Sequence, residues 1–121
     1  MKSKEAQLQA SCVEWFRYQY PKLAPLFFAI PNGGSRNKIE AANMKRTGTL
    51  AGVADMMLAI SCCFNDYDEP YHGLFIEFKS ESGKQTPTQK NFQIEVEQQG
   101  YLYVLINSFD LFKEVIGNYL K

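Results

Sequence analysis

The chain has 121 residues, 45% of them hydrophobic, and a formal net charge of zero at pH 7. This length suits one domain with a buried core, so residues 1–121 are expected to form a single domain. A zero net charge excludes a uniformly basic surface for nucleic acid, so any DNA contact must use local patches. No apolar run approaches membrane-spanning length, and we expect no membrane partner.

The three cysteines are Cys12, Cys62 and Cys63, an odd number without a CxxC pair. This usage fits reduced thiols in an intracellular protein better than a disulfide framework. We expect all three to be small buried apolar side chains.

An amphipathic helix is expected over residues 3–20. Leu8 and Phe16 belong to an apolar stripe at helical spacing, and Pro21 ends the pattern. Glu5 lies on the inward edge of that stripe. It is either an acid favoured by the helix dipole in the first turn or a group that faces a site formed elsewhere in the fold.

A short apolar strand over residues 26–30 leads through a glycine-rich turn into a second helix over residues 35–47. Glycines in residues 31–34 let the backbone approach a ligand closely. Amides at the helix start, with Arg36, can hold a phosphate; the alternative is a plain turn with a solvated arginine. Residues 36–46 are net basic. The candidate DNA contacts are Asn32, Gly33, Gly34, Arg36, Lys45 and Arg46.

Two apolar runs of strand length, residues 55–60 and 73–79, carry charges at their ends. Asp55 opens the first run, and Glu77 and Lys79 close the second. Buried charges are costly unless they are paired. Period two places Glu77 and Lys79 on one face of the strand, and Asp55 joins them if the strands are neighbours.

Two carboxylates so close repel each other unless a proton or a cation lies between them. Oxygen ligands without a nearby His or Cys favour Mg²⁺ or Mn²⁺. The alternative is a structural ion pair between Glu77 and Lys79. His72, the single histidine, is expected to be a surface or hydrogen-bonded group outside the site.

The remainder predicts a helix over residues 86–99, a strand over residues 101–106 and a final helix that ends near residue 120. Thr86 and Gln89 match a capping box. Gln89 also shares a helical face with apolar residues and therefore points to the core side, so both roles stay open.

The element order α-β-α-β-β-α-β-α predicts an α/β fold, a four-stranded mixed sheet flanked by helices on both faces. The short gap between residues 60 and 73 permits an antiparallel hairpin. Strands separated by a helix are expected to be parallel.

The spacing of Asp55 and Glu77-x-Lys79 resembles the PD-(D/E)XK nuclease signature. With its flanks, the pattern is similar to the VRR-NUC family, the virus-type replication-repair nucleases, over nearly the whole chain. The matching segments are Pro31–Arg36, Gly48–Asp55, Gly73–Lys79 and Thr88-Gln89. Ala54 stands where the family often has proline, a residue that shapes the backbone and ligates nothing.

This resemblance implies a restriction-endonuclease-like core and a DNA endonuclease that uses Mg²⁺ (or Mn²⁺). The implied catalytic residues are Asp55, Glu77, Lys79, Gln89 and Glu5. The implied metal ligands are Asp55, Glu77, the Phe78 carbonyl and Glu5, with Glu5 either direct or through a bound water. In the family a glutamine at the position of Gln89 lies beside the catalytic lysine.

Stand-alone VRR-NUC proteins resemble Holliday-junction resolvases and tend to be homodimers. The resemblance therefore implies a homodimer that acts on four-way DNA junctions. The alternatives are a flap- or end-processing nuclease and a non-catalytic nucleic-acid-binding domain on the same fold. Loss of the acidic pair or of the lysine would indicate the last, and all three residues are present.

Overall fold

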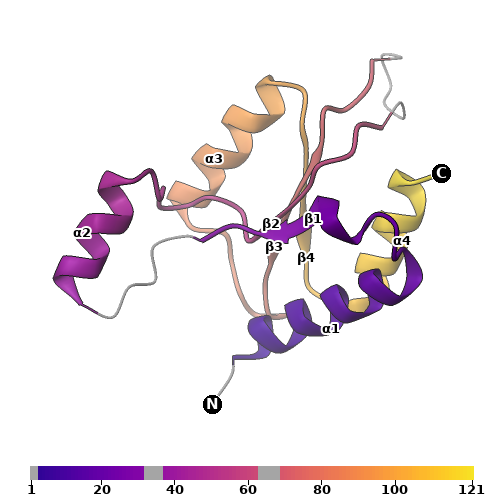
Figure 1. Cartoon of the computed structure of the whole chain (residues 1–121), viewed down its shortest axis with the longest axis horizontal. Helices are drawn as coiled ribbons and strands as arrows, with labels where there is room; N and C mark the ends of the chain where they lie inside the picture. Colours follow the sequence, from indigo (N-terminus) through magenta and orange to yellow (C-terminus); the bar gives the residue numbers. More distant parts are fainter. Residues whose placement is uncertain (1–2, 32–36, 63–68) are drawn as a thin grey trace.

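Four strands form one mixed sheet with helices on both faces (Figure 1). The structure is a computed structural model and describes residues 3–31, 37–62 and 69–121. The elements in chain order are α1 (Lys4–Gln19), the 3₁₀ helix η1 (Ala24–Leu26), β1 (Phe27–Ala29), α2 (Lys38–Arg46), β2 (Met56–Leu58), β3 (Leu74–Phe78), α3 (Pro87–Gln98), β4 (Leu102–Ile106) and α4 (Phe109–Tyr119). The order and the fold class that the sequence predicts are confirmed.

The strands lie in the order β1-β2-β3-β4. β2 and β3 form the expected antiparallel pair, with Met56 opposite Ile76. β3 and β4 are parallel, with Phe78 opposite Ile106, and α3 makes the crossover between them. The carboxyl ends of β3 and β4 therefore meet at the same edge of the sheet.

The expectation of parallel strands wherever a helix intervenes is wrong for the first pair. β1 and β2 are antiparallel, with Phe27 opposite Leu58. The reason is that α2 is no crossover helix: none of its residues is buried, and Figure 1 shows it standing beside the sheet. The chain can therefore enter β2 at the end where it left β1, which gives an antiparallel pair.

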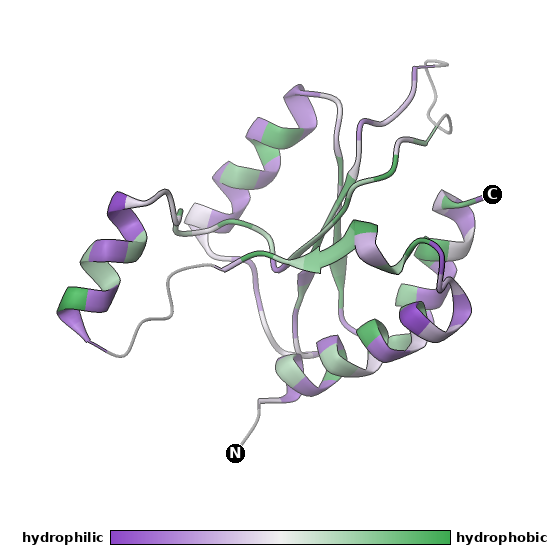
Figure 2. Cartoon of the chain, viewed as in Figure 1, coloured by the Kyte–Doolittle hydropathy of each residue, from purple (hydrophilic) through white to green (hydrophobic). Residues whose placement is uncertain are grey.

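Alternation along β3 divides the interior into two parts. Leu74, Ile76 and Phe78 join the larger core beneath α1 and α4, whereas Phe75 turns to the smaller cluster that includes α3 side chains. Figure 2 shows that hydrophobic residues follow the central strands and line the inner sides of the helices. Each fully buried large side chain in these clusters contributes about 1.5–3 kcal/mol. Glu77 follows the same alternation as Phe75 and so faces α3.

Hydroxyl and amide caps set where the helices begin. Ser3 Oγ accepts a hydrogen bond from the Ala6 amide at 3.0 Å, and Ser108 Oγ accepts one from the Leu111 amide at 3.1 Å. Asn37 caps α2, which starts later than the expected residue 35.

Cys12 and Cys62 are buried, as expected, and Cys63 lies outside the described residues. Cys62 pairs with Tyr71 in an antiparallel bridge that extends the β2–β3 hairpin. Within the three described ranges, no helix has the length and apolar character needed to cross a bilayer.

Candidate active site

The residue directly before β2, Asp55, is held against the end of β3. Its Oδ2 accepts a hydrogen bond from the Phe78 amide at 2.7 Å. Its own carbonyl accepts from the Ile30 amide at 2.8 Å, which fixes its backbone to the end of β1. Asp55 is therefore held by contacts to the ends of β1 and β3, the strands on either side of β2. The strand that follows Asp55 and the strand that carries Glu77 are neighbours, as the sequence predicts.

A glycine makes the path to Asp55 possible. Gly52 has a φ of +86°, and a Cβ there would lie 2.7 Å from the carbonyl oxygen of Thr88. Only a residue without a side chain allows this approach at a left-handed φ. The turn before β2 is thereby packed directly on the first turn of α3.

Glu77 is 3% exposed and carries its charge into the interior. Its Oε2 accepts a hydrogen bond from Gln89 Nε2 at 3.1 Å and lies 3.5 Å from Lys79 Nζ. Its Oε1 is buried and has no hydrogen-bond partner among the residues that the structure describes. One oxygen of a buried carboxylate is thus left for a proton or a cation.

The two carboxyl groups perturb each other. Burial, with the negative charge of Asp55 as the second cause, raises the pKa of Glu77 to about 7, although Lys79 opposes the shift. Burial also raises the pKa of Asp55, against the hydrogen bond from Phe78. Glu77, when protonated, can donate to Asp55.

Gln89 connects the lysine to the helix cap. Its Oε1 accepts from Lys79 Nζ at 2.8 Å and from the Thr86 amide at 2.9 Å. Its own amide donates to Thr86 Oγ1 at 3.2 Å. The capping box is confirmed, and the side chain that forms it also lies beside the lysine, so the two expected placements of Gln89 coexist.

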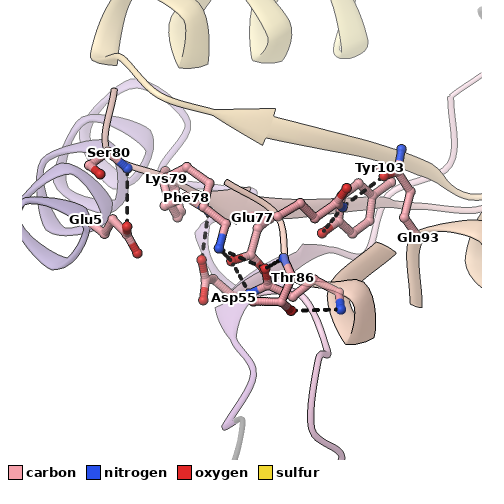
Figure 3. A network of polar contacts seen from close by, with 11 residues as sticks. Glu5, Asp55, Glu77, Phe78, Lys79, Ser80, Thr86, Gln93 and Tyr103 are labelled. Atoms are coloured by element: carbon pink, nitrogen blue, oxygen red, sulfur yellow. Dashed lines mark hydrogen bonds and ion pairs between the residues drawn. The ribbon is translucent and has the colours of Figure 1, made fainter. Parts of the chain in front are cut away.

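Glu5 is held at the side of the site by a different bond. Its Oε2 accepts from the Ser80 amide at 3.3 Å, and Figure 3 shows it apart from the acidic pair. Its charge still contributes to the raised pKa of Asp55. Among the described residues no group of three His, Cys, Asp or Glu side chains is placed to hold a metal. Glu5 is the acid in the first turn of α1, and its part in holding a metal, direct or through a bound water, stays a prediction.

Phe78 turns its ring away from the acids. The ring is 1% exposed and packs in the larger core, while the backbone of the residue passes Asp55. This is the alternation expected from the sequence, and it leaves the main chain as the part of Phe78 nearest the site. Its carbonyl as a metal ligand stays a prediction.

No protein-family model and no curated protein matches the sequence significantly. One solved structure, a "VRR_NUC domain protein", superimposes with a TM-score of 0.78 and 28% sequence identity. The alignment covers 99% of this chain and 90% of the other. The resemblance to the VRR-NUC family is confirmed. It extends over the sheet, the helices on both of its faces and the strand ends that carry the acids.

The VRR-NUC-like site has the ligand chemistry of a hard divalent cation. Asp55 and Glu77 supply two interacting carboxylates, and Oε1 of Glu77 has no partner among the described residues. In that part of the chain no cluster of three His, Cys, Asp or Glu side chains offers a different ligand set. Mg²⁺ completes its shell with waters and needs few protein ligands. The residues present therefore fit such an ion without a third acid.

The predicted DNA contacts are less well placed. Asn32, Gly33, Gly34 and Arg36 lie outside the described residues. Lys45 and Arg46 are exposed in the last turn of α2, the helix that stands beside the sheet in Figure 1. The structure thus leaves these two basic side chains accessible, away from the acidic pair.

A polar chain behind the site was not foreseen. Gln85 Nε2 donates to Gln93 Oε1 at 2.9 Å and to the Tyr103 hydroxyl at 3.3 Å, and burial raises the pKa of Tyr103 to about 12. Spacing was the available signal, since Gln85, Gln89 and Gln93 recur every four residues. Within α3 that interval places Gln89 and Gln93 on one helical face, while Gln85 lies just before the Thr86 cap.

Three helices begin at the edge of the sheet where β3 and β4 end. The first turn of α1 contacts Ser80, the first turn of α3 contacts Lys79, and a cleft of about 400 Å³ lies between Lys4, Lys79 and Asn107, just before α4. Helix N-termini carry partial positive charge. The VRR-NUC-like site is therefore at an edge that favours an anionic ligand.

Proposed function

We propose that this chain is a divalent-metal-dependent DNA endonuclease that resolves Holliday junctions as a homodimer. The observation that carries the proposal is the buried carboxylate of Glu77, which interacts with the charges of Asp55 and Lys79 and whose Oε1 lacks a protein partner in the described ranges. The similarity to a VRR_NUC domain protein supports a nuclease domain. Residues 1–121 are proposed to form that one domain.

Asp55 and Glu77 would hold the cation, with the Phe78 carbonyl as a further ligand and Glu5 acting through a water. When bound, a divalent cation offsets the charge of the phosphodiester and lowers the pKa of the attacking water. The protein supplies the two acids already oriented, because the Phe78 amide holds one and Gln89 holds the other. Little reorganisation is then needed for catalysis.

Lys79 is proposed to orient the attacking water or to stabilise the charge that develops on the phosphate. Its Nζ is held by Gln89 Oε1 at 2.8 Å and lies 3.5 Å from Glu77 Oε2. An ammonium has three N–H donors, so one remains to contact the substrate. Its side chain is 12% exposed, so it is largely enclosed by the site, and the remaining N–H can still reach a bound substrate.

Lys45 and Arg46 are proposed to contact the DNA backbone, together with Asn32, Gly33, Gly34 and Arg36. With a net charge of zero, affinity has to come from such local groups. A two-fold dimer would present two sites to the two strands that a four-way junction exchanges.

The decisive test is a cleavage assay with Mg²⁺ or Mn²⁺ on a four-way junction, a flap, a single strand and a linear duplex. We expect symmetric nicking of the junction, at least about ten-fold faster than of the duplex. Cutting confined to flaps or ends would replace the resolvase with an end-processing nuclease. Absence of cutting on every substrate, with DNA still bound, would indicate a binding domain.

Lys79→Ala is the matched control for that assay. We expect this variant to bind the junction and to lose cleavage by about 10²-fold or more, because the lysine acts on the reacting groups. Normal cutting by Lys79→Ala, in a preparation free of contaminating nuclease, would remove the lysine from the mechanism.

A further inference from the structure

We propose that Thr86 is a positioning residue of the active site, and that the cap of α3 determines which end of the Gln89 amide faces Lys79 and which faces Glu77. The inference rests on the proposed nuclease function for its catalytic consequence. Its structural part, the orientation of Gln89 by Thr86, stands on hydrogen bonds among described residues.

The polarity of the Gln89 amide follows from a single donor. The Thr86 backbone amide lies 2.9 Å from Gln89 Oε1, and a backbone N–H can only donate. The atom that it meets must therefore be the amide oxygen. Lys79 Nζ, which also can only donate, lies 2.8 Å from the same oxygen, so both contacts require one orientation.

That orientation controls both ends of the catalytic pair. With its oxygen held by Thr86 and Lys79, Gln89 must turn Nε2 to Glu77, where it donates to Oε2 at 3.1 Å. Oε2 is then occupied, and Oε1 is left without a hydrogen-bond partner among the described residues. A reversed amide would place its N–H groups against the Lys79 ammonium and its oxygen against the Glu77 carboxylate. Both contacts would then be repulsive, and neither hydrogen bond could form.

The Thr86 hydroxyl holds the backbone that makes this possible. Thr86 Oγ1 accepts from the Gln89 amide at 3.2 Å and so keeps the Thr86 N–H within reach of the side chain. The preceding residue is fixed as well, since Gln85 bonds to Gln93 and to Tyr103. Figure 3 shows Gln93 and Tyr103 beside the polar contacts that involve Thr86 and the acidic pair.

The chain contains a matched control. Ser108 caps α4 through the same kind of bond, from the Leu111 amide to Ser108 Oγ at 3.1 Å. Both caps are exposed hydroxyl groups at helix starts. Ser108→Ala should therefore lower the urea midpoint about as much as Thr86→Ala does, without touching Gln89.

The kinetic test compares Thr86→Ala, Thr86→Ser and Ser108→Ala on the cleaved DNA substrate. We expect Thr86→Ala to lower kcat about five- to ten-fold at unchanged KM, Thr86→Ser to restore it to within about two-fold, and Ser108→Ala to keep it. In a Gln89→Ala background, Thr86→Ala should cause no further loss of kcat. Equal loss in Thr86→Ala and Ser108→Ala, or full additivity with Gln89→Ala, would overturn the proposal.

The second test needs neither metal nor cleavage. In the metal-free protein, the side-chain amide signals of Gln89 are assigned by their loss in Gln89→Ala. We expect Thr86→Ala to move them towards the positions of exposed glutamine amides and Ser108→Ala to leave them in place. Unchanged signals in Thr86→Ala would refute the inference. If no DNA is cut by the wild type, this spectrum still decides the role of Thr86.

Discussion

At the scale of single residues, Glu77 dominates the energetics of the site. Among the described residues it is the one polar or charged side chain classed as buried. Gln89 and Lys79 satisfy one of its oxygens, and the other has no partner in the described part of the chain. A buried charge that is only partly paired destabilises the folded protein. A cation bound at Glu77 would remove that destabilisation.

The first prediction concerns the stability of the metal-free protein. The pKa of Glu77 is raised to about 7, whereas an unfolded glutamate titrates near about 4.3. Between these values the folded state binds more protons than the unfolded state, so the free energy of unfolding falls as pH rises. The loss should be on the order of 3 kcal/mol and should level off above about pH 7.

The measurement is urea unfolding in EDTA at pH 5 and pH 8, with Glu77→Gln as the control. The variant carries no titratable group at this position, so it should be close to the wild type at pH 5 and more stable than it at pH 8. Addition of Mg²⁺ at pH 8 should reduce the difference in stability between Glu77→Gln and the wild type, because an ion that binds the folded wild type stabilises it. A gap that is the same at both pH values would contradict the raised pKa.

The second prediction concerns Asp55. Asp55→Asn keeps a side-chain oxygen for the Phe78 amide but removes the charge that raises the pKa of Glu77. We expect the free energy of unfolding of the metal-free variant at pH 8 to exceed that of the wild type by about 1 kcal/mol. We also expect the variant to bind Mn²⁺ at least about ten-fold more weakly. Titration calorimetry that shows unchanged Mn²⁺ affinity would exclude Asp55 as a ligand.

At the scale of elements, the first turn of α3 organises the site. It supplies Gln89 to Lys79 and Glu77, and it packs on the Gly52 turn that delivers Asp55. The positions of Asp55 and Glu77, which come from different strands, thus both depend on contacts with the start of α3. A small displacement of this turn should move both Asp55 and Glu77. Catalysis is sensitive to such shifts, since a misplacement of about 1 Å can lower the rate about 10²-fold.

The third prediction tests that packing with two glycines. Gly52→Ala combines a left-handed φ with a Cβ 2.7 Å from the Thr88 carbonyl oxygen, whereas Gly48, at φ +108°, has nothing within 4 Å of its Cβ. Gly48→Ala should cost about 1–2 kcal/mol of strain, and Gly52→Ala about 1–3 kcal/mol more. Denaturant unfolding measures both, and equal losses would show that the Gly52–Thr88 contact is not tight.

At the scale of the whole molecule, topology assembles the site. The antiparallel β2–β3 pair brings Asp55 to Glu77, and the parallel β3–β4 pair brings the starts of α3 and α4 to the same edge. α1 adds Glu5 from the far end of the chain. One bond at the site, between Glu5 and Ser80, joins residues 75 positions apart in sequence, so the site should be lost together with the fold.

The fourth prediction is that the protein is a homodimer that nicks four-way junctions in preference to linear duplex. Paired sites related by a two-fold axis match the symmetry of the junction. Light scattering at assay concentrations gives the oligomeric state. A monomer that cuts duplex as fast as junction would rule out the resolvase and leave the nuclease.

The sequence by itself determined what depends on near neighbours. Periods of 3.6 and 2 predict the apolar stripes of the helices and the positions of Asp55, Glu77 and Lys79 at strand ends. Local capping chemistry predicts the Thr86–Gln89 cap. The structure bears these predictions out. Family resemblance added the grouping of the two acids with the lysine.

Only the tertiary structure decided what depends on distant contacts. The antiparallel β1–β2 pairing, the bond of Glu5 to Ser80 and the close packing of Gly52 on Thr88 have no local signature. Neither does the unpartnered oxygen of Glu77. Each arises when segments far apart in the chain are pressed together, and the free energy of that packing is a property of the assembled core rather than of any short stretch of residues.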